Sequence, residues 1–310
     1  MPEKHDLSYF SKKFLMSTLL SLLLAAGILY AQKNPTALAA PVETASEVAL
    51  DEQADQLVAA MSLPEKIGQM MLIGIPAPTL DGNTRALLQE MPLGGIILYD
   101  PNMQTRAQVL ALNQQLQDTA GRKLPLFISI DEECGLVARM KDQLMPPRSE
   151  EAIGHTGNPQ EARTSAIRTS QELRSLGFNL NFAPVADVGS GRERSFSQSP
   201  AAVATFVDEA AAGYEQEHIL YTLKHFPGIG KGIQDTHLDS VVVDAPLATL
   251  QKEDLLPFRQ MIQTHDARNY FIMVTHVSYP ALDSQHPASL SPAILTGLLR
   301  DELGYQGIII

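Results

Sequence analysis

The chain has 310 residues, of which 45% are hydrophobic and 19% are charged, and this composition is typical of one large globular domain. The formal net charge is −12, and no basic run lies in the body of the chain. This charge pattern excludes nucleic acid as a partner, because binding to its phosphates depends on clustered Lys and Arg.

The N-terminus differs in kind from the rest of the chain. Two lysines precede an apolar run at residues 14–31, and small residues follow that run. We expect residues 1–39 to be a secretory signal peptide or, if the segment is not cleaved, a membrane anchor through residues 14–31. The protein is therefore expected to be exported, to the periplasm or the cell exterior. Cys134 is the only cysteine, so no disulfide can form within the chain.

After a short linker predicted at residues 40–50, two kinds of segment alternate along residues 51–310, which we interpret as one domain. Short apolar runs predict buried strands, at residues 70–75, 94–99, 126–131, 180–185, 220–226, 270–276 and 307–310. Amphipathic stretches predict helices, at residues 49–61, 105–119, 158–177, 201–217, 250–263 and 291–304.

The alternation predicts the fold class. Strands without polar alternation, each followed by a helix, indicate an α/β protein with a parallel sheet covered on both faces. Seven such strands, with no glycine-rich phosphate-binding fingerprint after the first, favour an incomplete (β/α)8 barrel of the TIM type over an open doubly wound sheet. Catalytic groups of such barrels lie at the carboxyl ends of strands. That rule selects the polar residues that close strands three to six, which are Asp131, Asp187, Lys224, His225 and His276.

Residues 224–237 read KHFPGIGKGIQDTH and concentrate titratable side chains. Lys224 and His225 can present a cation and a hydrogen-bond donor to sugar hydroxyls or to an anion; the alternative is a solvated loop. Asp235 and His237 can form a dyad in which the carboxylate orients the imidazole while the second ring nitrogen exchanges a proton with substrate. The glycines between the two pairs predict a mobile loop that approaches a ligand closely.

A zinc site and a cysteine nucleophile are two alternatives to the sugar-binding and proton-transfer residues of this segment. Four side chains of types that bind zinc are present, His225, Asp235, His237 and His276, but their spacing matches no zinc motif. Cys134 has no sequence context typical of a nucleophile, so we interpret it as a buried or loop thiol.

Five motifs occur in a fixed order along residues 55–310. The segment ISIDEECGLVARM resembles D-x-E-G-G-R-V-x-R, and LGFNLNFAPVADV resembles N-x-N-F-A-P-V-x-D-V. RSFSQSP resembles R-S-F-G-x-x-P, and KHFPGIGKGIQDTH resembles K-H-F-P-G-H-G…D-[ST]-H. The stretch from VTHVSYP to the last residue resembles the segment that leads to a nucleophile. These are motifs of family 3 glycoside hydrolases, in particular of the bacterial β-N-acetylhexosaminidase branch that recycles peptidoglycan.

The resemblance implies a retaining hydrolysis of terminal β-linked N-acetylglucosamine in peptidoglycan fragments or chitooligosaccharides, with no metal or organic cofactor. It implies His237 as the general acid/base and Asp235 as its partner, in place of the carboxylic acid of most retaining glycosidases. It also implies that the terminal sugar is held by Asp131, Arg139, Arg194, Lys224 and His225. Taken alone, the two arginines in this set would be interpreted as surface charges.

Three residues depart from the family pattern. Ile229 replaces the second histidine of K-H-F-P-G-H-G and is expected to alter loop packing more than chemistry. Cys134 and Leu136 replace a glycine and an arginine of the strand-three motif, and are expected to reshape the pocket beside Asp131.

A fourth departure concerns the nucleophile. The family's nucleophilic aspartate follows strand seven in a [ST]-D-[DWY] motif, and the sequence stops at Ile310, a residue or two before that position. We therefore expect these residues to contain no nucleophile, to be a truncated form of an enzyme and to be inactive alone. One alternative is a non-catalytic protein that binds sugar or cell wall. Another is phosphorolysis, because a neutral histidine repels an attacking phosphate less than a carboxylate does.

Overall fold

The computed structural model describes residues 45–121, 124–133, 135–140, 148–191, 193–231 and 241–310, with side chains from Leu50 onward. The chain divides into two compact units, residues 1–61 and 62–310. In the described part of the first unit, helix α2 spans Ala45–Ala60. The second half of the predicted linker is thus helical, because its alanines and glutamate favour a helix.

The described helices include none that is both long enough and apolar enough to cross a membrane. The apolar run at residues 14–31 lies outside the described residues, so the signal or anchor remains a prediction.

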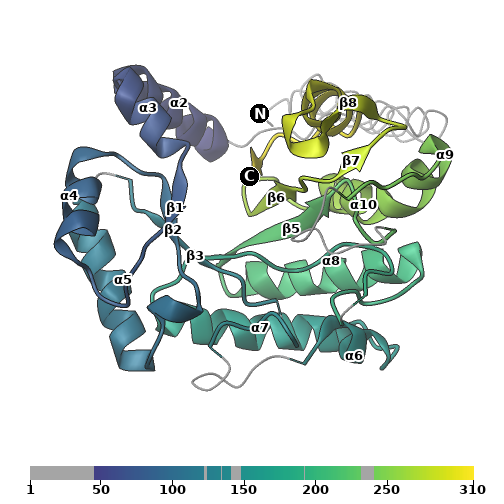
Figure 1. The fold of residues 1–310 in the computed structure, drawn as a ribbon, viewed down its shortest axis with the longest axis horizontal. Helices are drawn as coiled ribbons and strands as arrows, with labels where there is room; N and C mark the ends of the chain where they lie inside the picture. Colours follow the sequence, from purple (N-terminus) through teal and green to yellow (C-terminus); the bar gives the residue numbers. More distant parts are fainter. Residues whose placement is uncertain (1–44, 122–123, 134, 141–147, 192, 232–240) are drawn as a thin grey trace, which may run out of the picture. The chain divides into compact units, whose positions relative to one another are not determined.

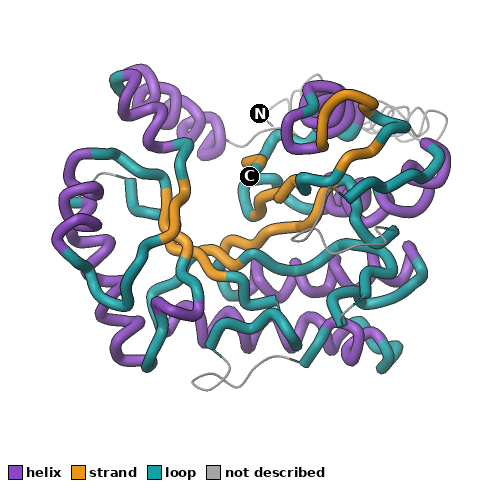
Figure 2. The backbone as a smooth tube through the Cα atoms, viewed as in Figure 1, coloured by secondary structure: helices purple, strands orange, loops and turns teal. Residues whose placement is uncertain are grey.

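The second unit is built around seven parallel strands that follow one another in chain order across one sheet. The strands are β1 (Leu72–Gly74), β2 (Gly95–Ile97), β3 (Phe127–Ile130), β4 (Leu180–Asn181), β5 (Leu220–Phe226), β6 (Tyr270–Val274) and β9 (Ile308–Ile309). The sheet curls into a half-barrel, with β1 and β9 as its edges (Figures 1 and 2). The prediction of a TIM-type α/β barrel with about seven strands is confirmed.

Helices follow the strands as expected. The longer ones are α4 (Gly82–Glu90), α5 (Arg106–Ala120), α7 (Gln160–Ser175), α8 (Pro200–Gln216), α10 (Leu256–Thr264) and the π-helical η4 (Ala293–Glu302). The shorter ones are α3 (Leu63–Gln69), η1 (Asp100–Asn102), α6 (Glu150–Gly154), α9 (Leu247–Thr249), the π-helical η2 (Leu250–Asp254) and η3 (Ala288–Leu290). A small antiparallel hairpin joins β7 (Ser278–Tyr279) to β8 (Asp283–Pro287).

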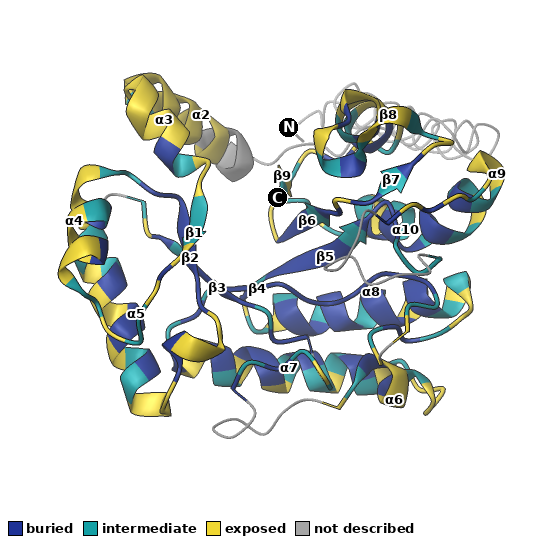
Figure 3. Cartoon of the chain, viewed as in Figure 1, coloured by how far each residue is buried: buried dark blue, intermediate teal, exposed yellow. Residues whose placement is uncertain are grey.

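The sheet has two faces with different partners. Alternate residues such as Ile128 and Leu223 belong to the large core beneath the helices, where α7 packs on α8 and α8 on α10 (Figure 3). A second and smaller cluster lies on the concave face, and Phe127, next to Ile128 in sequence, and Leu220, three residues before Leu223, pack against it. Because side chains alternate along a strand, Lys224 lies in the register of the concave face, near the carboxyl end of β5.

His265, at the end of α10, ties that helix to α8. Its Nδ1 lies 2.9 Å from Glu215 Oε1, and its Nε2 lies 3.2 Å from Asp208 Oδ1. Burial acts to lower the pKa of His265, but the hydrogen bonds and charges of these two carboxylates outweigh burial and raise the pKa above its usual value. Burial acts to raise the pKa of Glu215, but hydrogen bonds from His265 and Tyr221 lower it instead.

We expect His265→Gln to lower the free energy of unfolding by on the order of 1 kcal/mol, and only in part of the pH range. Since the folded protein binds the His265 proton more tightly than the unfolded chain, the contribution is complete below the ordinary value of 6.5 and is lost as pH rises through the raised pKa. The part that depends on the Glu215 charge is present above the ordinary value of 4.5 and is lost as pH falls through the lowered pKa of Glu215. Urea unfolding at several pH values, with exposed His155→Gln as the control, measures this; a difference that grows toward pH 9 contradicts it.

Candidate active site

A buried lysine joins the carboxyl ends of two strands. Asp131 follows β3 directly, and Lys224 Nζ lies 2.8 Å from its Oδ1. The same Nζ lies 2.5 Å from Glu133 Oε1, and the lysine side chain is only 2% exposed. Burial acts to lower the pKa of Lys224, but the charges of Glu133 and Asp131 outweigh it and raise the pKa. Lys224 is therefore a charged group enclosed by two carboxylates.

Arg194 makes a two-point ion pair with Glu133 from the loop between β4 and α8. Its Nε lies 2.7 Å from Glu133 Oε2, and its Nη2 lies 2.8 Å from Oε1. Burial acts to raise the pKa of Glu133, but the charge of Lys224 and the hydrogen bond and charge of Arg194 lower the pKa to about 2. Sequence reasoning did not select Glu133 as a site residue, although its acidic position in the D-x-E motif was a usable signal.

Asp187, after β4, holds the ring and backbone of His225. His225 Nδ1 lies 2.7 Å from Asp187 Oδ2, while the backbone N–H groups of His225 and Ile229 donate to Oδ1 at 3.2 and 2.8 Å. On its other side, His225 Nε2 lies 3.4 Å from Arg194 Nη2. A guanidinium can only donate, so we infer that neutral His225 carries its proton on Nδ1 and accepts at Nε2.

Arg139 lies at the accessible rim of the same group of side chains. Its Nη2 is 3.4 Å from Asp131 Oδ2, its Nη1 is 4.0 Å from Asp100 Oδ2, and its guanidinium lies over the Tyr99 ring, 5.9 Å from the centroid. The Arg139 backbone N–H donates to Glu132 Oε2 at 2.9 Å, and burial raises the pKa of Glu132 to about 7.

Those contacts bring together all five residues predicted to hold a sugar. We call the connected set the charged cluster; it comprises Asp131, Glu133, Asp187, Arg139, Arg194, Lys224 and His225. Three carboxylates face three permanent cations, so the cluster is balanced without counting the histidine. Hydrogen-bond donors and acceptors thus stand side by side at the strand ends, which suits the recognition of neutral hydroxyl groups.

The segment that follows the cluster is held closely. Gly228 has a φ of +121°, and a Cβ there would lie 2.7 Å from the Cβ of Asp254. A Cβ at Gly230 would lie 1.7 Å from the carbonyl oxygen of Val188. Lys231 then pairs with Asp254 at 2.6 Å. These two glycines permit close backbone packing, and the rest of the loop expected to be mobile, from residue 232 to residue 240, lies outside the described residues.

The remaining sequence candidates fall into two groups, those outside the described residues and those within them. Asp235, His237 and Cys134 fall outside the described residues, so the proposed dyad has no described geometry. His276 is exposed and its Nδ1 lies 2.8 Å from Ser289 Oγ. Leu136 is 56% exposed.

No set of three or more His, Cys, Asp or Glu side chains in the described part of the chain is arranged to hold a metal ion. Two members of the four-residue zinc set considered from sequence fall outside that part. Ile229 packs against the large core, in line with the expected role in loop packing.

Comparison with known proteins agrees with this architecture. Residues 62–310 match the model of the glycosyl hydrolase family 3 N terminal domain. The chain belongs to glycosyl hydrolase family 3. As a member of that family, it is 36% identical over 263 residues to a protein named Beta-hexosaminidase A from Pseudoalteromonas piscicida, covering 75% of this chain and 42% of that one. The chain thus spans less than half the length of this curated relative.

Solved structures of the family have the same fold. A glycoside hydrolase family 3 β-N-acetylglucosaminidase from Paenibacillus sp. str. FPU-7 superposes with a TM-score of 0.77 at 34% identity, over 81% of this chain and 49% of that one. NagZ from Neisseria gonorrhoeae, in complex with N-trifluoroacetyl-D-glucosamine, superposes with a TM-score of 0.72 at 29% identity, over 77% and 72% of the two chains.

Proposed function

We propose that the product of the complete reading frame containing these residues, called the full-length protein below, is a retaining β-N-acetylhexosaminidase. Its substrates are peptidoglycan fragments or chitooligosaccharides, from which it removes terminal β-linked N-acetylglucosamine. The charged cluster carries this proposal, because it joins the family's motif residues at the carboxyl ends of β3 and β5. The similarity to proteins named β-hexosaminidase supports it.

The cluster is suited to grip a terminal sugar through its hydroxyls. Each oxygen of Asp131 is held by one cation, Oδ1 by Lys224 and Oδ2 by Arg139, which fixes the plane of the carboxylate. Each of these oxygens keeps a second lone pair that can accept from a sugar O–H. The Arg194 side chain is 25% exposed, so it can donate to a sugar oxygen while it remains paired with Glu133.

Proton transfer is assigned in this proposal to His237, with Asp235 as the carboxylate that orients it. The assignment is supported by the motif position of both residues, eleven and thirteen residues after Lys224 in sequence. A histidine acid protonates the leaving oxygen, and its neutral form then activates water, as a retaining mechanism requires. We further propose export of the protein, which the apolar run at residues 14–31 supports.

The proposed function can be tested with the His237→Ala variant of the full-length protein, assayed on two substrates that differ in their leaving groups. We expect turnover of a disaccharide with a poor leaving group to fall by about 10²- to 10⁴-fold, the usual contribution of general acid catalysis. Turnover of an activated aryl N-acetylglucosaminide should fall much less during glycosylation, because its leaving group needs little protonation. Steady-state kinetics on the two substrates measures the contrast, and His276→Ala is the matched control.

Equal losses on both substrates would remove His237 from the role of acid. Hexosaminidase activity is a separate question: a full-length wild type that releases no N-acetylglucosamine from either substrate would overturn the proposed function. Release of sugar 1-phosphate in phosphate buffer would instead identify phosphorolysis.

A further inference from the structure

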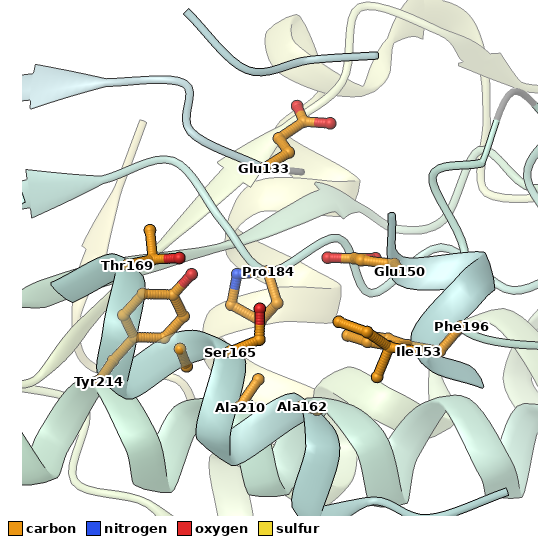
Figure 4. A pocket seen from close by; sticks show the side chains of 11 residues that line it. Glu133, Glu150, Ile153, Ala162, Ser165, Thr169, Pro184, Phe196, Ala210 and Tyr214 are labelled. Carbon is orange, nitrogen blue, oxygen red and sulfur yellow. The ribbon is translucent and has the colours of Figure 1, made fainter. Parts of the chain in front are cut away.

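An acid that takes no part in the charged cluster is buried behind it. Glu150 is the first residue of α6 and is 2% exposed, whereas its neighbour Glu151 is exposed. An acidic residue in the first turn of a helix ordinarily remains in water, where it interacts with the helix dipole. Figure 4 shows the Glu150 side chain pointing inward, toward Pro184, among apolar neighbours that include Ile153 and Phe196.

One carboxyl oxygen of Glu150 fastens the chain segment that ends in Asp187. Val185 N–H donates to Glu150 Oε1 at 2.8 Å, and Val185 lies two residues before Asp187. The same segment is bonded to β5, since Ala186 N–H donates to the carbonyl oxygen of Lys224 at 2.7 Å. The position of Asp187, and through it the ring of His225, therefore depends on a contact made by Glu150.

The second oxygen, Glu150 Oε2, has no hydrogen-bond partner among the described residues. It belongs to a side chain that lines a small cavity of about 20 Å³, with Ser165, Thr169 and Tyr214 also on the wall. A cavity of this size has room for about one water molecule. The proton of an uncharged Glu150 can thus be donated to a water molecule in this cavity.

A charge at this position would disturb the cluster. The ionisable groups that act on Glu150 are Glu133, Arg194 and Lys224, and the three cations of the cluster are already matched by three carboxylates. Burial raises the pKa of Glu150 well above its usual value, and the negative charge of Glu133 adds to the rise. The pKa is lowered, by a smaller amount, by the hydrogen bond from Val185 N–H and by the charges of Arg194 and Lys224. An ionised Glu150 would be a fourth negative charge without a partner.

We propose that Glu150 is a positioning residue of the site, an uncharged acid that holds the Val185–Asp187 segment, and so the ring of His225, without adding a charge behind Glu133. The sugar-binding consequence rests on the proposed function, whereas the effect on His225 does not.

Four variants of the full 310-residue chain test the proposal, Glu150→Gln, Glu150→Leu, Glu151→Gln and Glu151→Leu. Glu150→Gln keeps both the acceptor for Val185 and a donor for the cavity. The His225 ring signals in NMR spectra should therefore keep their positions, and the Kd for N-acetylglucosamine should change by less than about 2-fold. Glu150→Leu removes the acceptor, so the ring signals should shift and the Kd should rise about 10-fold or more. The Glu151 variants should match the wild type.

Infrared spectroscopy gives a measurement that does not depend on sugar or on the folding of the leucine variant. At pH 7 the wild type should show the carbonyl stretch of protonated carboxylic acids, to which Glu132 also contributes because its pKa is about 7. Glu150→Gln should lose the part of this band that belongs to Glu150, while Glu151→Gln keeps the whole band. No loss from the band in Glu150→Gln, a glutamine variant as damaged as the leucine variant, or a folded leucine variant with unchanged His225 signals would each overturn the proposal. A 310-residue wild type that fails to bind N-acetylglucosamine would count against the sugar-binding role proposed for the charged cluster, and would leave the ring signals and the infrared band to decide on Glu150.

Discussion

Replacing Lys224 with Met is expected to lower the free energy of unfolding by about 3–5 kcal/mol, the range seen when one partner of a buried ion pair is removed. The lysine side chain is 2% exposed, and its Nζ contacts both Asp131 and Glu133. Methionine has a similar length and shape but leaves both carboxylates without this cation. Affinity for N-acetylglucosamine should fall below detection, since Asp131 loses the contact that fixes its Oδ1.

Urea unfolding of the 310-residue chain measures the loss, with exposed Lys252→Met as a control that removes a charge without uncovering a buried one. A second comparison separates burial of charge from packing. Adding Glu133→Gln to Lys224→Met should recover part of the stability, because Lys224→Met leaves three carboxylates facing two arginines, and neutralising Glu133 restores the balance of charge. A loss below about 1 kcal/mol for Lys224→Met, or no recovery in the double variant, would show that the buried ion pair contributes little.

The sheet was predictable from sequence because its strands are short apolar runs that follow the chain order. Each of the seven runs contains a strand, and the order of the seven strands across the sheet is their order along the chain. Helix α4 and the hairpin β7–β8 were missed. Residues Asp283–Pro287 read DSQHP, which contains no apolar core residue, so only its pairing with β7 makes it a strand.

The charged cluster was predictable in part, for a reason of geometry. In a parallel barrel the carboxyl ends of strands converge, so polar residues at those ends meet wherever they lie in sequence. That rule selected Asp131, Asp187, Lys224 and His225, which do meet, and also His276, which bonds Ser289 instead. It could not show which group pairs with which.

Glu150 illustrates what the sequence could not show. It stands in the polar stretch RSEEA, where two adjacent acids begin a helix and both would be expected in solvent. Only the packing of α6 decides that Glu150 points inward and Glu151 outward. Similarly, the sequence could not show that the surroundings of Gly228 and Gly230 leave no space for a Cβ.

Replacing Asp187 with Asn is expected to weaken N-acetylglucosamine binding by about 10- to 100-fold while the domain stays folded. The asparagine oxygen can still accept from the backbone N–H groups of His225 and Ile229, as Asp187 Oδ1 does. Its NH₂ group would replace Oδ2 and point a donor at His225 Nδ1. His225 would then have to move its proton to Nε2, where it meets the donor Nη2 of Arg194 at 3.4 Å. Two donors facing each other at this partly buried contact cost about 1–3 kcal/mol, which corresponds to the expected loss of affinity.

The tautomer itself is the decisive measurement. Nitrogen chemical shifts of the His225 ring should report a proton on Nδ1 in the wild type and on Nε2 in Asp187→Asn, with exposed Asp301→Asn as the control. Asp187→Ala should be more damaging than Asp187→Asn, because it also leaves two backbone donors unmatched. If Asp187→Asn binds the sugar as tightly as the wild type, or if its ring keeps the proton on Nδ1, then the link from Asp187 through His225 to Arg194 does not control recognition. In that case the ion pairs of Lys224 and Glu133 alone would define the binding surface.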